Sequence, residues 1–389
     1  MPEVATPATV DGVSAVLRAA DRQAVVVRGG GTKPHWGAPP RSCDLVLDLH
    51  RLDRVVDHAA GDMVAQVQAG VRLDRLAAVL AQAGQQFAVD IPSYDDGTVL
   101  GAGTVGGALA VGLAGPRRLR YGPVRDLVLG VTMVRADGAV ASAGSRVVKN
   151  VAGYDLGKLL CGSYGTLGTI VAAILRLHPL PAATAWVTTR TPDPATAYRR
   201  ARALLDSQLV PTAVEIDRPG VGEPVTVAAL FEGTGDGVAA RAEAAAGLVA
   251  GAAGEAPPAW FGRLPGAPDG VLVDVRFPPA VLVEVLDLVD AAARGSGLPA
   301  VVRGSAGPAE LQVALAAEAE PLGGFLTHLR DGLAPYRGHA LVRHAPEPVR
   351  SGVDVWGPVE DGTLRLMRQV KDQFDPHHRL ASGSFVGGI

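Results

Sequence analysis

The chain has 389 residues, of which 48% are hydrophobic and 19% are charged, and its formal net charge is -3. This length allows two domains with sizeable cores, and the composition is typical of a globular protein. A charge so close to zero indicates no polyanionic partner, so nucleic-acid binding is not expected. The two cysteines, Cys43 and Cys161, lie far apart, without the spacing of a disulfide framework, a zinc site or an iron–sulfur cluster. We therefore expect no metal site.

The N-terminal stretch MPEVATPATVDG lacks the basic and apolar segments of a secretory signal peptide. No uninterrupted apolar run reaches the roughly 18 residues that a membrane-spanning helix needs, so no membrane span is expected. Together these features predict a cytoplasmic protein.

The first region mixes helix and strand patterns without a regular strand–helix–strand rhythm. Apolar residues at helical spacing predict helices at 13–20 and 73–80. Residues 126–144 are typical of a hairpin that turns at Asp137-Gly138, and 168–181 of a strand ended by prolines. This mixture favours an α+β fold over a doubly wound α/β fold, and we expect one domain over 1–181.

From about residue 185 strands and helices alternate, which predicts a second α+β domain over 182–350 with one helix-covered, ferredoxin-like sheet. Within it a helix is expected around 308–317, and the Pro/Gly/Ala-rich stretch 250–270 is expected to be a surface loop. The remaining segment, 351–389, should contain a helix that ends at Asp375-Pro376 and packs back onto the first domain.

Three glycine-rich stretches stand out: RGGGTK (28–33), GAGTVGGA (101–108) and GSYGTLG (162–168). The second contains G-x-G-x-x-G, but the preceding VDIPSYDDGTV is a poor buried strand, so a Rossmann dinucleotide site is not favoured. Glycine costs about 0.5–1 kcal/mol relative to Ala inside regular structure, so three clusters suggest a use for bare backbone, such as binding phosphate. Three of the four lysines, among them Lys33, lie in or beside these stretches, where an ammonium suits an anion. Ordinary turns in a glycine-rich chain are the alternative.

Read together, three longer segments resemble a known family: VVVRGGGTKPHWG, GTVGGALAVGLAGPRRLRYGPVRDLVLGVTMVRADGAV and VVKNVAGYDLGKLLCGSYGTLGTIV. They are similar to the FAD-binding domain of the vanillyl-alcohol oxidase and p-cresol methylhydroxylase (PCMH-type) group. Within that group the chain most resembles FAD-binding subunits of bacterial glycolate oxidases. The resemblance continues to VKDQFDPHHRLASGSFVGGI at the C-terminus. It is dense over about 25–181 and 364–389 and thin over 185–350.

The resemblance implies that FAD pyrophosphate lies between two glycine loops of an α+β domain. The implied first loop consists of Arg28, Gly29, Gly30, Gly31, Thr32 and Lys33, and the second of Gly103, Thr104, Val105, Gly106 and Gly107. It further implies that Pro92 flanks the flavin ring, that Ala110 and Gly115 line the cofactor, and that Gly165, Gly168 and Ile170 approach the adenosine half. Arg120, which follows the second loop, is also expected to contact the cofactor.

Two departures from the family pattern shape the expected function. Relatives that tether FAD covalently carry His where this chain has Thr32, which implies noncovalent FAD. Catalytic relatives carry an H-x-G-D-G-N-x-H segment in the second domain, whereas this chain has only the scattered His328, His339 and His344, so no general base can be nominated.

The resemblance therefore implies an FAD-dependent oxidoreductase of the glycolate oxidase kind, which accepts electrons from a small 2-hydroxy acid into FAD and passes them on. The implied partners are a second FAD subunit and an iron–sulfur subunit, and activity is expected to require them. The alternative is a noncatalytic or assembly subunit that retains the fold.

Overall fold

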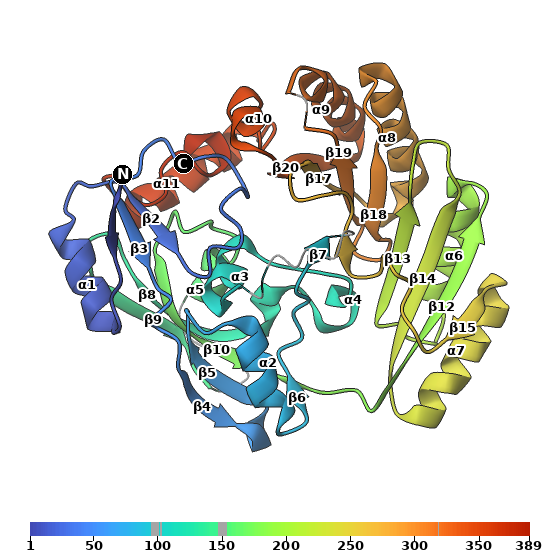
Figure 1. Cartoon of the computed structure of the whole chain (residues 1–389), viewed down its shortest axis with the longest axis horizontal. Helices are drawn as coiled ribbons and strands as arrows, with labels where there is room; N and C mark the ends of the chain where they lie inside the picture. The colour runs from blue at the N-terminus through green and yellow to red at the C-terminus, as the bar shows by residue number, and fades with distance from the viewer. Residues whose placement is uncertain (95–100, 102, 147–153, 318) are drawn as a thin grey trace.

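The computed structural model describes residues 1–94, 101, 103–146, 154–317 and 319–389 (Figure 1). Its architecture is α+β, as the sequence predicts: two sheets with their helices form the N-terminal part, and an eight-stranded sheet forms the other part. Lys149, one of the three lysines in or beside the glycine-rich stretches, lies outside the described residues.

The N-terminal part begins with a parallel three-stranded sheet in the order β1 (Glu3–Ala5), β3 (Leu45–Asp48), β2 (Val25–Arg28). The predicted first helix is confirmed as α1 (Val10–Ala19), and its Val13 and Leu17 pack into the same apolar cluster as strand residues Val25 and Leu47. Thr9 caps this helix by accepting a hydrogen bond from the Gly12 N–H.

The second N-terminal sheet has five antiparallel strands in the order β4, β5, β10, β8, β9. These strands are Val55–Ala59, Val64–Gln68, Thr169–Arg176, Val128–Val134 and Val140–Gly144, respectively. The predicted hairpin is thus confirmed as β8 and β9, and the predicted second helix as α2 (Leu73–Ala81). Two shorter helices, α3 (Val105–Val111) and α5 (Leu156–Leu160), contribute to the core of this sheet.

The eight-stranded sheet consists of two β-α-β-β-α-β units. The first unit is β12 (Ala183–Thr191), α6 (Pro194–Leu205), β13 (Ala213–Arg218), β14 (Val225–Gly233), α7 (Gly235–Val249) and β15 (Ala252–Gly254). The second is β17 (Val271–Arg276), α8 (Leu282–Ser296), β18 (Val301–Ser305), β19 (Glu310–Leu315), α9 (Ala319–Leu333) and β20 (His339–His344). Across the sheet the order is β15-β12-β14-β13-β18-β19-β17-β20, so the two units meet through the antiparallel pair β13–β18.

Strand alternation gives the two faces of this sheet different chemistry. On β13, Val214 and Ile216 enter the apolar cluster that the four helices share with the sheet, whereas Glu215 and Asp217 point to the other face. The other central strands follow the same rule, so a polar face is turned toward the N-terminal part (Figure 1). Its buried polar side chains are Glu215, Asp217, Asp274, Arg303, Ser305, Glu310 and Arg343.

Two expectations for this region are wrong. The helix expected around 308–317 is replaced by β19, because Leu311, Val313 and Leu315 alternate into the core and pairing with β18 and β17 overrides the helix propensity of its residues. Within the expected surface loop 250–270, Arg263–Leu264 form β16, which pairs in parallel with β7 (Ser93–Tyr94) of the N-terminal part.

The C-terminal segment forms α11 (Asp361–Phe374), which ends at the predicted position before Asp375-Pro376. Val370 and Phe374 pack against the core of the five-stranded sheet. Lys371 is completely buried and its Nζ donates to the Asp375 carboxylate at 2.7 Å and to the carbonyl oxygens of Thr166 at 2.7 Å and Leu380 at 3.0 Å. These bonds fasten the helix to the turn before β10.

Candidate functional site

The first two glycine stretches meet where β2 and α3 approach each other. β2 ends at Arg28, and Thr104 caps α3 by accepting the Gly107 N–H at 3.2 Å. A Cβ on Gly29 would lie 2.3 Å from Thr104 Oγ1, and a Cβ on Gly30 would lie 3.3 Å from Gly103 Cα. The loops can therefore approach this closely only because glycine occupies these positions.

Lys33 supplies a positive charge to this pair of loops. Its Nζ lies 3.0 Å from Thr32 Oγ1 and 3.0 Å from where a Cβ on Gly103 would stand. In the described part of the chain no carboxylate pairs with it, whereas the Arg28 guanidinium donates to Asp48 at 2.7 and 2.9 Å. Burial, assisted by the charge of Arg343, lowers the pKa of Lys33 to about 8. Bare backbone and an unpaired ammonium fit the diphosphate of FAD.

The structure gives several of the other predicted glycines a packing reason. The N–H groups of Val105 and Gly106 are bonded to the carbonyl oxygens of Val71 and Ala69, and a Cβ on Gly106 would lie 2.7 Å from Ala69 Cβ. A Cβ on Gly115 would lie 2.5 Å from Asp90 Cβ, and one on Gly168 would lie 2.1 Å from Met133 Cε. Their cofactor contacts remain predictions.

The remaining predicted residues fall beside this region. The Ala110 carbonyl accepts the Tyr164 N–H at 2.8 Å, which places α3 next to the turn that carries Gly165. Ile170 is buried on β10, opposite Met133. Arg120 is exposed and acts on the pKa of Tyr121 and His178, so its surroundings give its predicted cofactor contact no support.

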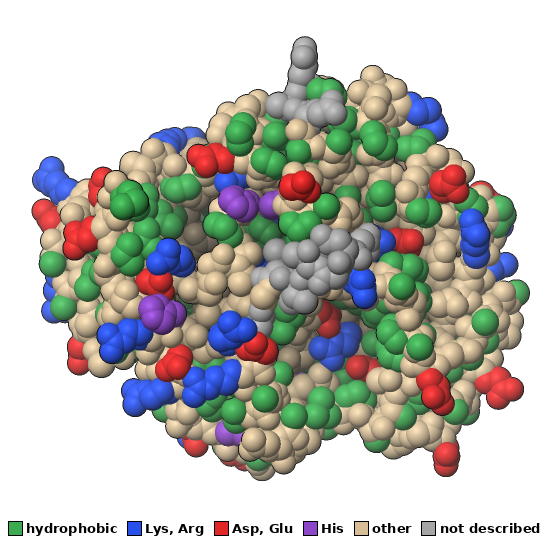
Figure 2. All heavy atoms as spheres, in the orientation of Figure 1, with side chains coloured by type: hydrophobic (Ala, Val, Ile, Leu, Met, Phe, Trp, Pro, Cys, Tyr) green, Lys and Arg blue, Asp and Glu red, His purple; other side chains and the backbone are tan. Residues whose placement is uncertain are grey.

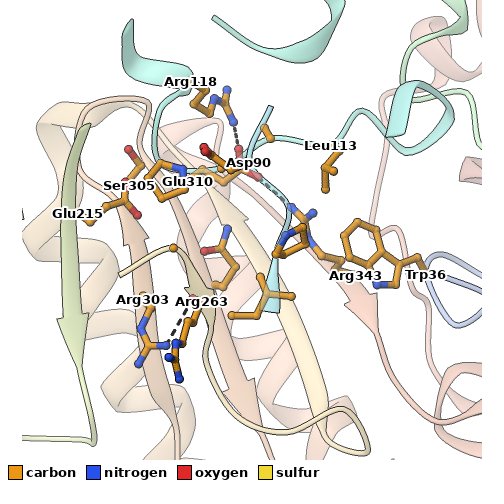
Figure 3. Close-up of a pocket in the computed structure, with 17 residues that line it drawn as sticks. Trp36, Asp90, Leu113, Arg118, Glu215, Arg263, Arg303, Ser305, Glu310 and Arg343 are labelled. Atoms are coloured by element: carbon orange, nitrogen blue, oxygen red, sulfur yellow. Dashed lines mark hydrogen bonds and ion pairs between the residues drawn. The ribbon is translucent and has the colours of Figure 1, made fainter. Parts of the chain in front are cut away.

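A central pocket lies between the N-terminal part and the polar face of the eight-stranded sheet (Figure 3). It brings the predicted Pro92 and Gly115 together with residues that the sequence analysis missed. The side chains that line it include Trp36, Asp90, Pro92, Leu113, Arg118, Glu215, Arg263, Leu264, Arg303, Ser305, Glu310, Gln312 and Arg343. Its volume is about 50 Å³, room for about four water-sized groups.

Paired charges form the wall of this central pocket. Glu310 accepts from Arg118 of the N-terminal part, from Arg276 at 3.2 Å and from Arg343 at 3.1 Å. Arg343 also donates to Asp274 at 2.7 Å, and its guanidinium carbon lies 4.8 Å from the centre of the Trp36 ring. The Lys33 Nζ lies 5.7 Å from the same ring. Trp36 therefore links the glycine loops to the pocket through contacts with two cations.

A larger side cavity of about 570 Å³ adjoins the central pocket and shares Asp90, Pro116 and Gly262 with it. Arg117 and Asp90 form an ion pair of 2.6 Å on its wall. Figure 2 shows the molecule hollowed between its two parts, with acidic and basic side chains in the hollow. A solvent-open hollow beside a small charged pocket is typical of a site for a small polar ligand.

The three scattered histidines lie outside the central pocket. His328 and His339 are exposed, and the His344 ring contacts the Pro268 carbonyl and the edge of His35. In the described ranges no group of three His, Cys, Asp or Glu side chains is arranged to hold a metal ion, and both cysteines are free. The same ranges contain no helix long and apolar enough to cross a bilayer.

Comparison with known proteins shows what the N-terminal part is similar to. Residues 2–144, which carry both glycine loops, match a family described as FAD binding domain. The fold of the chain is similar to that of a solved alkyldihydroxyacetonephosphate synthase, which superposes with a TM-score of 0.69 over 97% of this chain and 75% of its own, at 17% sequence identity.

Curated relatives match shorter stretches of the chain at higher sequence identity. A D-2-hydroxyglutarate dehydrogenase of Xanthomonas citri pv. viticola is 37% identical over 46% of this chain and 37% of its own length. Glycolate oxidase subunit GlcE of Escherichia coli is 36% identical over 42% of this chain and 45% of its own length. A D-lactate dehydrogenase of Archaeoglobus fulgidus is 37% identical over 45% of this chain and 38% of its own. The matched region thus spans less than half of each of these relatives.

Proposed function

We propose that this protein is an FAD-linked oxidoreductase that takes electrons from a small 2-hydroxy acid and passes them to a partner subunit. The observation that carries the proposal is the continuity between the glycine loops and the central pocket through Trp36. The relatives add a chemical class, because D-2-hydroxyglutarate, glycolate and D-lactate are all 2-hydroxy acids. We further propose that residues 1–181 and 351–389 hold FAD and that residues 182–350 cover it.

Different residues of the chain would bind the cofactor and the substrate. Gly29, Gly30 and Gly103 would bring bare backbone to the diphosphate, and Lys33 would neutralise part of its charge. The pocket arginines would attract and orient the carboxylate of the substrate. FAD, when bound, supplies the two-electron chemistry that no side chain here offers.

Noncovalent FAD and a partner-dependent role are part of the proposal. Thr32 carries no nucleophilic ring nitrogen, and its Oγ1 lies beside Lys33 Nζ instead. In the described ranges no cysteine cluster is present to carry electrons onward, so an external acceptor is needed. The likeness to a glycolate oxidase subunit supports an acceptor within a complex. We propose a second FAD subunit and an iron–sulfur subunit as the partners.

The test is anaerobic reduction of the purified chain. We expect a yellow protein whose flavin absorbance bleaches on addition of glycolate, D-lactate or D-2-hydroxyglutarate, with slow oxidase turnover until partner subunits are added. A colourless protein, or a yellow protein that none of these acids reduces, would favour the assembly-subunit alternative. Rapid saturable turnover by the chain alone would refute the partner-dependent role.

A further inference from the structure

Glu215 holds an exceptional position on the polar face of the eight-stranded sheet. It lies on β13, where the two β-α-β-β-α-β units meet, and is paired in register with Ser305 of β18. The residue is 5% exposed, and Figure 3 shows its carboxyl group and the Ser305 side chain close together on the wall of the central pocket.

The neighbouring acidic residues of this face have cationic partners, whereas Glu215 has none within the described ranges. Asp217 pairs with Arg303 at 2.7 Å, and Asp274 accepts from Arg343 at 2.7 Å. By contrast, Glu215 Oε1 and Ser305 Oγ are buried and neither makes a hydrogen bond of good geometry with a described residue, although the Ser305 hydroxyl is near enough to favour the Glu215 carboxylate. A buried polar atom left unpaired costs about 1–3 kcal/mol, so this pair is suited to an incoming ligand.

The surroundings of Glu215 favour its neutral form. Burial raises the pKa of Glu215 to about 8, the carboxylates of Asp90 and Glu310 add to the rise, and Ser305 and Arg118 offset part of it. The Arg303 charge on the adjacent strand is balanced by Asp217. A carboxyl group that titrates near neutral pH can both take up and release a proton during catalysis.

We propose that Glu215 is the general base of the central pocket and accepts the hydroxyl proton of the 2-hydroxy acid. In this step the O–H proton passes to the Glu215 carboxylate, and the O–H electron pair forms the C2=O bond. The C2–H bond breaks, and its hydrogen would leave with both electrons as a hydride, for which FAD, when bound, would be the acceptor. The products would be a 2-oxo acid, neutral Glu215 and the two-electron-reduced cofactor. The Ser305 hydroxyl would donate to the substrate oxygen and hold it beside Glu215.

This proposal rests on the proposed function and supplies the base that the sequence did not reveal. Its decisive variant is Glu215→Gln, which keeps the size and removes the base. The matched control is Glu223→Gln, which changes an exposed carboxylate between β13 and β14. Glu223 lines neither the central pocket nor the side cavity.

The experiment measures anaerobic flavin reduction by D-lactate, D-2-hydroxyglutarate and glycolate between about pH 6 and pH 9, a range that brackets the pKa of Glu215. For the wild type and E223Q we expect the second-order rate constant of flavin reduction to rise with pH and level off above about pH 8. E215Q should keep its flavin and its affinity for a 2-oxo acid, but its rate constant of flavin reduction should fall roughly 10²- to 10⁴-fold and lose this pH dependence.

An infrared titration of the flavin-loaded protein gives a readout that needs no turnover. The wild type should lose a protonated-carboxyl C=O band with a midpoint near pH 8, and E215Q should lack that band. If E215Q is reduced at the wild-type rate with the same pH profile, or if the wild type shows no such band, Glu215 is not the base. If no 2-hydroxy acid reduces the wild-type flavin, the proposed function fails, and the role of Glu215 fails with it.

Discussion

The pKa of Lys33 predicts that FAD affinity falls at alkaline pH. With its pKa at about 8, Lys33 is mostly charged at pH 7 and mostly neutral at pH 9. A bound diphosphate favours the ammonium and raises its pKa, so binding above pH 8 requires uptake of a proton. The stabilisation is therefore fully present below the pKa of the free site and is lost as the pH rises through it.

The size of the effect follows from the fraction of charged Lys33. One pH unit above the pKa about one tenth of the amines are protonated, so the apparent Kd for FAD should rise about tenfold between pH 7 and pH 9. Lys33→Arg should remove this dependence, because a guanidinium remains charged throughout the range. Lys33→Met should bind FAD weakly at every pH. Its Kd should be roughly tenfold to a hundredfold above that of the wild type at pH 7, which is the effect of losing a hydrogen bond to a charged group.

Fluorescence titration of flavin-free protein with FAD at several pH values measures these constants. Parallel melting curves would confirm that each variant is folded over the range. A wild-type Kd that stays constant from pH 7 to pH 9, or a Lys33→Arg variant with the wild-type slope, would refute the placement of Lys33 at the diphosphate.

Three further predictions concern the cofactor and the C-terminal segment. Acid precipitation should release the flavin into the supernatant; colour retained in the pellet would show a covalent bond. Gly29→Ala should weaken FAD retention and lower the stability by about 1 kcal/mol, because its Cβ would lie 2.3 Å from Thr104 Oγ1 and disturb the cap of α3. Gly61→Ala, which adds a Cβ in open space, should change neither FAD retention nor stability. Lys371→Met should lower the free energy of unfolding, measured in urea, by about 3–5 kcal/mol, because it leaves the charge of the buried Asp375 unpaired. Lys158→Met breaks an exposed ion pair and should lower it by less than about 1 kcal/mol. Equal losses in the two variants would contradict this reasoning.

Local patterns predicted much of the N-terminal part. The apolar stripes of α1 and α2 and the Asp-Gly turn between β8 and β9 are short-range signals, and the structure confirms each of them. The glycine stretches were also visible, because glycine is costly wherever it has no use. The sequence did not show which glycines allow the loops to approach closely, such as Gly29, and which are needed for core packing, such as Gly168. That difference depends on contacts with residues distant in the sequence.

The polar wall of the central pocket could not be predicted in the same way. Along β13 and β18 the sequences AVEID and VVRGS alternate apolar and polar residues, which is typical of a sheet with one solvated face. Here that face is buried against the N-terminal part, as the pairing of β7 with β16 and the contact between Arg118 and Glu310 show. The acidic and basic residues at alternate positions of these strands could have indicated a polar pocket wall. A solvent-exposed face of a sheet would show the same pattern.

The register between the two β-α-β-β-α-β units links the core to the proposed chemistry. Val214 and Ile216 on β13 and Val302 on β18 must enter the helix-covered core, so Glu215 must face the pocket opposite Ser305, and Asp217 must face Arg303. A shift of one residue on either strand would turn these apolar side chains outward and force the charged ones into the core. Apolar burial thus fixes the position of Glu215 without any contact dedicated to it. This explains why a proposed catalytic residue can stand in an ordinary alternating strand, with no motif around it.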